Sequence, residues 1–446
     1  MNREEDLLCI FQAALTAVEP ASLLQQRLIL EGERLGVRDA SIGSSFDLRR
    51  FERIVVLGAG KASAAMAAAL ERLLGERIRE GLVVVKDGYA LPLRRVRCLE
   101  AGHPVPDERG LAGAEELARL ASGADGNTLV IVLVSGGGSA LLPAPLPPLS
   151  LEDKARVTRS LLACGADIGE VNCLRKHLSR LKGGRLVSLM RGATVLALIL
   201  SDVPGDRLDT IASGLTVPDP STFADAARIV RKYGLELPDS VRQTLAQGLA
   251  GGLEETPKPG DPRFAQVHNV LVGTNRTGLE AARRRAAELG YRPVVLSSRV
   301  VGEAREVGRV YAAVAMDQRR FRSLDSSGQP LCLLAGGETT VTLRGRGRGG
   351  RNQECALAFL AELEGAPEAE GIHFLAASSD GTDGPTDAAG AFATADVLEQ
   401  SRRQGLEARE FLRDNDSYAF FQKAGGLLRT GPTNTNVCDY QICLVL

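Results

Sequence analysis

Short apolar runs alternate with helical patterns along much of the chain, and this alternation limits the folds that the sequence can adopt. In the first third the apolar runs lie at 53–57, 82–85, 96–99 and 129–134. An Ala-rich helical pattern at 62–74 and another at 107–122 separate them. Adjacent parallel strands need such crossover helices, and buried parallel strands read as continuous apolar runs. The pattern therefore predicts a doubly wound α/β domain with a mostly parallel sheet.

Further elements flank this region. Helical periodicity covers residues 5–35 with a break at Pro20, and two more helical patterns lie near 150–165 and 168–190. A strand is expected at 194–200.

The alternation restarts after residues 249–266, a segment rich in Gly, Pro and charged residues. Beyond it we expect strands at 268–272, 293–296, 331–334, 339–343, 373–377 and 440–445. Helices are expected at 276–289, 302–320 and 352–363, with two short helices before the last strand. Because polar, flexible segments commonly separate domains, we expect two α/β domains, residues 1–255 and 256–446.

Composition excludes several classes of partner. The 446 residues carry 54 Lys and Arg against 55 Asp and Glu, so the net charge of −1 gives no general attraction for nucleic acid. Trp is absent and aromatic residues make up 4%, which leaves few rings to stack on bases. No segment approaches the ~18 continuous apolar residues of a membrane helix, and the eight cysteines form no CxxC pair. We therefore expect a cytoplasmic protein without nucleic-acid or membrane partners.

The segment GAGKAS at 58–63 follows a predicted strand and opens a predicted helix. Backbone N–H groups at a helix N-terminus attract anions, and Lys61 adds a positive charge. The segment is neither a P-loop, which needs GxxxxGK[ST], nor a complete dinucleotide fingerprint. A strand-to-helix turn with a solvated lysine is therefore the alternative to an anion site.

A second glycine loop follows the strand predicted at 129–134 and reads Ser135-Gly136-Gly137-Gly138-Ser139. Open α/β sheets bind ligands at the carboxyl ends of their strands. Consecutive glycines let the backbone approach a phosphate closely, and the two serines add hydroxyl donors. We interpret this loop as a phosphate site, with a ligand-free flexible turn as the alternative.

Carboxylates also follow predicted strands. Asp202 and Asp206 come directly after the strand at 194–200, and Asp380 and Asp383 lie in the turn after 373–377. Mg²⁺ takes oxygen ligands, usually one or two carboxylates together with substrate phosphates. The carboxylates that follow the strand at 194–200 are therefore candidate Mg²⁺ ligands. The turn that holds Asp380 and Asp383 carries more small polar donors and acceptors than a bare turn needs.

Two segments concentrate positive charge. Residues 344–354 interleave four arginines, including Arg351, with glycines, and the segment favours an arginine-lined anion loop over an RNA-binding segment because it is short and lacks aromatic residues. Residues 170–185 form a cation-rich helical pattern that ends in Lys182-Gly183-Gly184. This second segment is either a solvated helix face or the wall of an anionic cleft.

Nine ordered motifs run through the chain, and they are specific as a set although each is weak alone. They are GAGKAS at 58–63, GHPVPD at 102–107, SGGGSAL at 135–141, KGGRL at 182–186, LSDVPGD at 200–206, GGETTV at 336–341, GGRNQE at 349–354, GTDGPTDAAGA at 381–391 and GPTNTNV at 431–437. Together they resemble the class II glycerate 2-kinase family, whose C-terminal half is the MOFRL domain and whose members have often been labelled hydroxypyruvate reductases. The resemblance extends from about residue 5 to the C-terminus.

This resemblance implies two α/β domains facing a cleft, of which the N-terminal one is Rossmann-like. It implies the transfer of a phosphoryl group from ATP to the 2-hydroxyl of D-glycerate, an ATP:D-glycerate 2-phosphotransferase reaction that yields 2-phosphoglycerate and ADP. The family's catalytic lysine falls on Lys61, and its arginine from the second domain falls on Arg351. The sequence leaves a homodimer open.

With the family in view, we assign the loop from Ser135 to Ser139 to the nucleotide phosphates. Lys61 and Arg351, with Asn352, are assigned to the glycerate carboxylate or the transferred phosphoryl group. Asp202 is assigned to Mg²⁺. The proton acceptor for the substrate hydroxyl is Asp206, Asp380 or Asp383, and the sequence does not choose among the three.

Two other functions are compatible with parts of the pattern. An NAD(P)H-dependent hydroxypyruvate reductase is the rival enzyme, although the chain lacks a full dinucleotide fingerprint with a ribose carboxylate. A non-catalytic binding module for nucleotides or sugar acids is the third hypothesis.

The chain also departs from the family at Leu215, where members commonly have Pro, and at Asn434, where they have Gly. We expect these two departures to affect loop geometry more than chemistry.

Overall fold

A computed structural model describes residues 3–38, 45–321 and 328–446, without the side chain of Leu162. The chain forms two compact units. The first-sheet unit contains Pro20–Ser201 and Asp206–Val272, and the second-sheet unit contains the chain up to Glu19, Asp202–Gly205 and Gly273–Leu446. The N-terminal helix thus packs with the C-terminal half of the sequence. The expected division at residue 255 stays a prediction, and the two units are described separately below.

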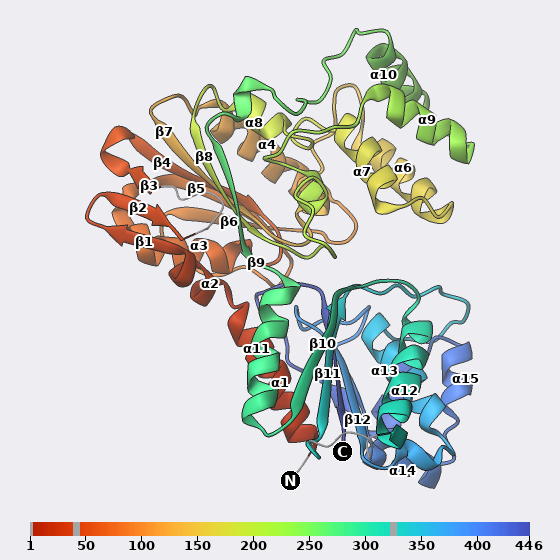
Figure 1. The fold of residues 1–446 in the computed structure, drawn as a ribbon. Helices are drawn as coiled ribbons and strands as arrows, with labels where there is room; N and C mark the ends of the chain where they lie inside the picture. Colours follow the sequence, from red (N-terminus) through yellow and green to blue (C-terminus); the bar gives the residue numbers. More distant parts are fainter. Residues whose placement is uncertain (1–2, 39–44, 322–327) are drawn as a thin grey trace. The chain divides into compact units, whose positions relative to one another are not determined.

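The first-sheet unit is built around parallel strands with helices between them (Figure 1). Its strands are β1 (Leu28–Glu31), β2 (Arg34–Val37), β3 (Ser45–Asp47), β4 (Arg53–Ala59), β5 (Ile78–Lys86), β6 (Val96–Ala101), β7 (Thr128–Val134), β8 (Thr194–Leu200) and β9 (Val267–Gly273). Its helices are α2 (Pro20–Arg27), α3 (Ser63–Leu74), α4 (Glu108–Ser122), α5 (Gly138–Leu141), α6 (Leu151–Ala163), α7 (Ile168–His177), α8 (Arg185–Leu189), α9 (Phe223–Tyr233) and α10 (Asp239–Leu249).

The main sheet of this unit has the strand order β6-β5-β4-β7-β8-β9. Neighbouring strands from β6 to β8 are parallel, which confirms the doubly wound, Rossmann-like prediction. The strand order reverses between β4 and β7, because the chain moves outward from β4 on one side and from β7 on the other. Ligands bind at such a reversal, beyond the carboxyl ends of the strands.

The second-sheet unit has a mixed sheet with the order β10-β11-β15-β12-β13-β14. Its strands are β10 (Arg292–Val300), β11 (Leu331–Gly337), β12 (Ile372–Ser378), β13 (Gly390–Ala393), β14 (Leu427–Leu428) and β15 (Asp439–Val445). Its helices are α1 (Arg3–Ala17), α11 (Asn275–Glu288), α12 (Ala304–Phe321), α13 (Arg351–Leu363), α14 (Ala395–Arg403), α15 (Ala408–Arg413) and α16 (Ser417–Ala424).

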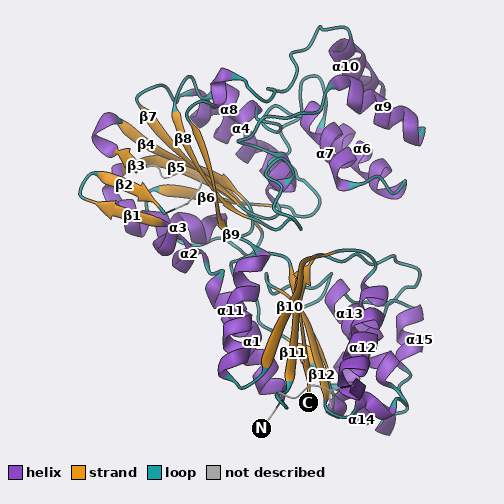
Figure 2. Cartoon of the chain, in the orientation of Figure 1, coloured by secondary structure: helices purple, strands orange, loops and turns teal. Residues whose placement is uncertain are grey.

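Helices cover both faces of this mixed sheet. Helices α1 and α11 pack together on one face, and α12 and α13 lie on the other, as Figure 2 shows. Helix α13 is buried almost along its whole length, and the Phe359 ring stacks on Phe374 of β12 with centroids 4.2 Å apart. The α/β class predicted for this half of the sequence is therefore confirmed, with a mixed sheet.

Four local predictions were wrong. Residues 28–35 form the hairpin β1–β2 instead of a helix, because Gly32 at φ +57° opens a two-residue turn between Glu31 and Arg34. The helix expected over 168–190 ends at His177, and positive φ at Gly183 and Gly184 separates it from α8.

The other two errors concern strands. The strand at 268–272 was expected to open the second half, but β9 is the last strand of the first sheet. Residues 339–343 form only an isolated bridge between Thr340 and Glu303. The chain leaves the sheet there because a glutamate side chain, from Glu303, holds the backbone and hydroxyl of Thr342.

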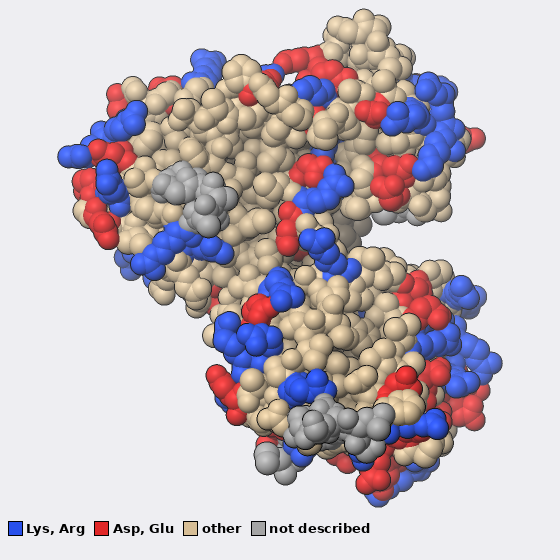
Figure 3. All heavy atoms as spheres, viewed as in Figure 1, with Lys and Arg blue, Asp and Glu red and all other residues tan. Residues whose placement is uncertain are grey.

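On the face shown in Figure 3, Lys and Arg side chains are interspersed with Asp and Glu, as the net charge of −1 suggests. Among the described helices, none is long and apolar enough by itself to cross a bilayer. Helices α1 and α2 pass that test only as a bent pair, by length and composition.

Candidate functional site

The two glycine loops of the first-sheet unit lie side by side at the strand-order reversal. The Lys61 amide donates to the carbonyl of Gly136 over 2.8 Å, and the Ala62 amide donates to Ser135 Oγ over 3.0 Å. At Gly60, where φ is +135°, a Cβ atom would lie 2.2 Å from Ser135 Oγ, so only glycine fits this approach. The structure thus brings together the GAGKAS segment and the Ser135–Ser139 loop.

The two loops differ in what their backbone amides can bind. The amides of Gly60, Lys61, Ala62 and Ser63 all donate to protein acceptors. An anion site made by the backbone of residues 58–63, as we expected, is therefore not what the structure contains. No described residue accepts a hydrogen bond from the Gly136 or Gly137 amide. Those two N–H groups remain available for a phosphate.

Side chains flank the open amides. Gly137, at φ +85°, lies against the His103 ring and the Lys61 side chain, since an added Cβ would be 3.0 Å from His103 Nε2 and 3.7 Å from Lys61 Cγ. His103 follows β6 and was missed as a site residue by the sequence reasoning. The GHPVPD motif was the signal that could have identified it.

A strained segment supports the loop from its other side. Ala212, Ser213 and Gly214 have consecutive positive φ values of 48°, 57° and 67°. Non-glycine residues in this conformation cost about 1–2 kcal/mol each, and such strain persists where the surroundings enforce it. The amides of Gly183 and Gly184 hold the segment by donating to the carbonyls of residues 213 and 214. The motif Lys182-Gly183-Gly184 therefore stabilises this turn through its backbone amides.

The strained turn contacts the glycine loop through a chain of side chains. Ser139 Oγ lies 2.8 Å from Ser213 Oγ, and the Ser213 hydroxyl donates to Asn172 Oδ1 over 2.9 Å. Asn172 belongs to α7 and is 3% exposed. Because Ser213 gives its proton to Asn172, its oxygen is the acceptor for the Ser139 hydroxyl. This chain fixes the orientation of Ser139.

In the second-sheet unit, Arg351 is the first residue of α13, and its side chain contacts the first residue of β15, Asp439. Its Nε donates to Asp439 Oδ2 over 2.6 Å and its Nη2 to Asp439 Oδ1 over 2.9 Å. Arg351 Nη1 lies 3.0 Å from Glu338 Oε1. The Arg351 side chain is 28% exposed, whereas Asp439 is fully buried. The guanidinium is therefore held in place by two carboxylates, while the side chain as a whole keeps some exposure to solvent.

Asp383 caps the N-terminus of α13. Its two carboxylate oxygens accept from the backbone amides of Asn352 and Gln353, at 3.0 and 2.9 Å, and from the amide side chains of the same residues. Burial raises the pKa of Asp383 to about 6. Asn352 and Asp383 are each 1% exposed. Their contacts are those of a helix cap.

The remaining sequence-predicted carboxylates lie in different surroundings. Asp202 Oδ2 accepts from Asn436 Nδ2 over 3.4 Å, and the Cys438 thiol donates to the Asp202 carbonyl. Asp380 is 3% exposed and accepts from Ser378 Oγ and the Thr382 amide. Asp206, at φ +58°, belongs to the first-sheet unit and is partly exposed. Asp202 thus contacts residues that directly precede Asp439, the partner of Arg351.

The described residues contain no group of three His, Cys, Asp or Glu side chains that could hold a metal ion. The carboxylate and carboxamide of Asp202 and Asn436 supply hard oxygen atoms. Mg²⁺ commonly keeps several waters and binds one or two carboxylates with substrate phosphates. These residues therefore fit a Mg²⁺ ion only when a substrate supplies further oxygen ligands.

The two departures from the family pattern lie in different surroundings. Asn434 has φ +60°, in the left-handed region that Asn tolerates better than other non-glycine residues. Leu215 is 3% exposed and packs in the core after the strained turn. Asn434 therefore adopts a backbone conformation that glycine also favours.

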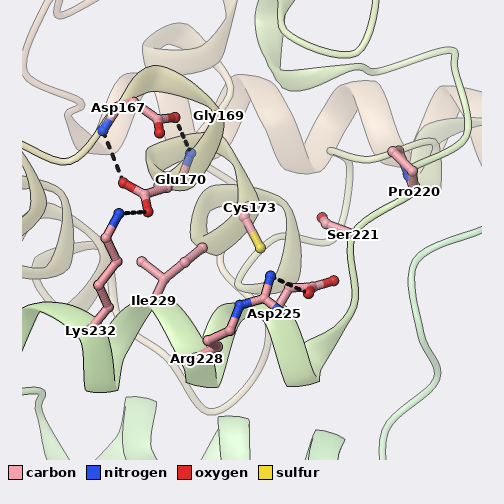
Figure 4. Close-up of a pocket in the computed structure, with 10 residues that line it drawn as sticks. All are labelled: Asp167, Gly169, Glu170, Cys173, Pro220, Ser221, Asp225, Arg228, Ile229 and Lys232. Atoms are coloured by element: carbon pink, nitrogen blue, oxygen red, sulfur yellow. Dashed lines mark hydrogen bonds and ion pairs between the residues drawn. The ribbon is translucent and has the colours of Figure 1, made fainter.

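A separate cavity of about 620 Å³ lies between α7 and α9 (Figure 4). Its charged side chains pair with one another, as Glu170 does with Lys232 and Asp225 with Arg228. Asp167 caps α7, and Asp225 accepts from the backbone amide of Thr222, the residue that caps α9. None of the sequence-predicted site residues lines this cavity.

Comparison with known proteins identifies the family. A family model described as "Domain of unknown function (DUF4147)" matches residues 6–246, and the MOFRL family model matches residues 331–439. A "Glycerate 2-kinase" of Pyrococcus horikoshii is 39% identical over 97% of this chain and 95% of its own length. The chain belongs to the MOFRL glycerate 2-kinase family.

Other members of the MOFRL glycerate 2-kinase family support the same assignment. A "Putative hydroxypyruvate reductase" of Agrobacterium vitis is 45% identical over 88% of this chain and 87% of its own length. The crystal structure of a glycerate kinase from Thermotoga maritima is 37% identical, covers 99% of each chain and has a TM-score of 0.82. Membership of this family confirms the resemblance inferred from the nine motifs, and the T. maritima structure confirms the α/β fold class.

Proposed function

We propose that the chain is an ATP-dependent D-glycerate 2-kinase, which transfers the γ-phosphoryl group of ATP to the 2-hydroxyl of D-glycerate and releases 2-phosphoglycerate and ADP. Its similarity to the P. horikoshii glycerate 2-kinase supports this reaction. The structural observation that carries the proposal is the pair of open amides, Gly136 and Gly137, beside Lys61 at the strand-order reversal. Such a loop binds phosphates in open α/β sheets.

In this proposal the loop from Ser135 to Ser139 binds the nucleotide phosphates. The Gly136 and Gly137 amides donate to phosphate oxygens, and Ser139, whose hydroxyl donates to Ser213 Oγ, fixes the end of the loop beside them. Ser135 acts indirectly, because its hydroxyl accepts from the Ala62 amide and ties the two loops together.

Phosphoryl transfer requires positioning and cancellation of charge more than covalent chemistry by the protein. In this proposal Lys61 and Arg351 bind the glycerate carboxylate or the transferred phosphoryl group. Their positive charges hold these anions in position and offset negative charge during transfer. Arg351 is oriented by Asp439. Asn352, which is buried against Asp383, acts by fixing the start of α13 and not by touching the substrate.

Asp202 would hold Mg²⁺ together with phosphate oxygens, and the bound ion would neutralise charge on the phosphates during transfer. For the proton of the substrate hydroxyl we propose Asp206. Asp380 and Asp383 are 3% and 1% exposed and accept hydrogen bonds within their own unit, whereas Asp206 is partly exposed.

An enolase-coupled assay tests the reaction and its position. Purified protein is incubated with D-glycerate, ATP and Mg²⁺, and the product is passed to enolase with and without phosphoglycerate mutase. Enolase accepts 2-phosphoglycerate directly, so we expect a signal without mutase. A signal that requires mutase would move phosphorylation to the 3-hydroxyl, and no signal in either case would refute the kinase.

The reductase alternative has one structural feature against it. A dinucleotide fold places the ribose-binding carboxylate after the second strand of the sheet. Here Asp87 follows β5, and Arg109 occupies both of its oxygens at 2.7 and 2.8 Å. We expect no hydroxypyruvate-dependent oxidation of NADH or NADPH, measured by absorbance under the same conditions.

A further inference from the structure

Two lysines are buried behind the glycine loop of the first-sheet unit. Lys182 is 1% exposed, and its Nζ donates to the Leu142 carbonyl over 2.5 Å. Lys154, on α6, is 9% exposed, and its Nζ donates to the Pro143 carbonyl. Both acceptors follow α5, whose first residue is Gly138 of the loop. The two ammonium groups therefore bind the backbone that continues from the phosphate loop.

A third cation accompanies them. Arg175 lies on α7, is partly exposed, and is close enough to lower the pKa of both lysines, after the larger effect of their burial. Burial also lowers the pKa of the Arg175 guanidinium itself. For Lys154 the result is a pKa of about 7, to which Arg180 contributes as well. These charges therefore repel one another in a poorly hydrated region.

This cluster of Lys154, Arg175 and Lys182 has no acidic partner. In the part of the chain that the structure describes, no Asp or Glu forms an ion pair with any of the three. The neighbouring Lys176 shows the usual solution, because it pairs with buried Asp219 at 3.3 Å. Burying like charges without a counter-ion is unfavourable, and an anion bound nearby relieves that cost.

The place of Arg175 indicates where such an anion binds. Asn172 lies one helical turn before it on α7 and accepts from Ser213, which contacts Ser139 of the glycine loop. Residues three apart on a helix share a face. Arg175 therefore lies on the face of α7 that is turned to the loop with the open Gly136 and Gly137 amides.

We propose that Arg175 binds an anionic group of the substrate pair, a phosphate or a carboxylate, at the Ser135–Ser139 loop. Lys154 and Lys182 hold the end of the loop through the Pro143 and Leu142 carbonyls. The identity of the ligand rests on the proposed kinase function, but the existence of an anion site does not. Arg175 has a planar guanidinium that suits both oxyanions.

Binding of inorganic pyrophosphate tests the site without catalysis. Thermal unfolding of the full chain is followed with increasing pyrophosphate for the wild type, Arg175→Gln and Arg156→Gln. Arg156 is an exposed arginine on α6 and controls for the loss of one charge. We expect pyrophosphate to raise the Tm of the wild type and of Arg156→Gln. For Arg175→Gln the concentration needed for the same shift should rise about tenfold or more.

Steady-state kinetics then distinguish the two sources of the anion. A rise in KM for ATP in Arg175→Gln, with KM for D-glycerate unchanged, identifies a nucleotide phosphate. The reverse identifies the glycerate carboxylate. Arg175→Lys keeps the charge and should recover part of the loss, which a purely structural role would not predict.

The inference is overturned if Arg175→Gln unfolds cooperatively, responds to pyrophosphate like the wild type and keeps both KM values. If Arg175→Gln does not fold, the same measurements on Arg175→Lys decide the question. A wild type that binds pyrophosphate through Arg175 but does not phosphorylate D-glycerate would refute the kinase proposal and leave the anion site intact.

Discussion

Arg351 and Asp439 form a two-pronged ion pair, with Nε–Oδ2 and Nη2–Oδ1 distances of 2.6 and 2.9 Å. Asp439 opens β15, where it pairs with Gly337 of β11 and Ser378 of β12. The pair therefore anchors the start of α13 to the middle of the second sheet. Bidentate pairs of this kind fix the plane of the guanidinium as well as its position.

Arg351→Ala should destabilise the protein as well as reduce its activity. The substitution leaves the fully buried Asp439 carboxylate without its partner, and breaking a buried pair costs about 3–5 kcal/mol. The double variant Arg351→Ala with Asp439→Asn should recover stability but not turnover, because it removes the unpaired charge without restoring the cation. Urea unfolding and the enolase-coupled rate are compared for both variants. Equal stability of the single and double variants would contradict this account.

Lys61→Ala should separate activity from stability. Lys61 lies in a loop beside the open amides, so its removal is expected to lower kcat by about 10²–10³-fold with little change in Tm. Arg72→Ala, on the exposed face of the helix that follows the loop, is the matched control and should retain wild-type kcat. An unchanged kcat in folded Lys61→Ala would refute the assignment.

Gly60→Ala should disturb the contact between the two glycine loops. A Cβ at this position would lie 2.2 Å from Ser135 Oγ and 2.4 Å from the Ser135 carbonyl oxygen, in a backbone with φ +135°. Overpacking of this kind costs about 1–3 kcal/mol, and displacement of the loop should also raise KM for ATP. Gly126→Ala serves as the control, since its Cβ would meet nothing closer than 4.0 Å. Similar Tm and KM values for the two variants would show that the loops do not need this close approach.

Asp383 should make stability fall as the pH rises from about 4 to 6. Burial raises its pKa from 3.8 to about 6, so over this range the folded chain keeps a proton that the unfolded chain has lost. The Asn variant loses this titration, and the stability of the wild type relative to Asp383→Asn should decrease by on the order of 1–3 kcal/mol across the range. Urea midpoints at pH 4 and pH 7 measure the effect.

Asp387→Asn provides the comparison of opposite sign. Hydrogen bonds from Tyr418 and Arg429 lower the pKa of Asp387, so its contribution to stability is present at neutral pH and is lost as the pH falls below about 4. The stability of the wild type relative to Asp387→Asn should therefore be larger at pH 7 than at pH 4. The same slope in both variants would show that Asp383 does not titrate as described.

Asp202→Asn should weaken the response to Mg²⁺. Replacement of a charged ligand by a neutral one is expected to raise the Mg²⁺ concentration for half-maximal rate at least about tenfold, as loss of even an outer-shell partner can do. Asp317→Asn, an exposed carboxylate on α12, is the control. A wild-type Mg²⁺ dependence in Asp202→Asn would exclude Asp202 as a ligand.

Local sequence patterns predicted most elements because burial and chain geometry act locally in them. The apolar run at 53–57 became β4 and the Ala-rich pattern became α3, since a buried strand followed by a helix leaves its pattern in adjacent residues. The hairpin at 28–37 was missed because its pairing depends on a two-residue turn at Gly32 within an apparently helical periodicity. Thr342 was misassigned because a glutamate side chain, distant in sequence, determines its backbone hydrogen bonding.

The sequence by itself determined the α/β class, the family and the two loops that meet at the strand-order reversal. Each of these features can be recognised from residues that are contiguous in the chain. The tertiary structure decided how those residues are used. Hydrogen bonding between the loops consumes the GAGKAS amides and leaves those of Gly136 and Gly137 open. Likewise, folding buries Lys154 and Lys182 without an acidic partner among the described residues, and it turns Asp383 into a helix cap. Partners and burial arise from residues far apart in the chain, so only the folded structure assigns them.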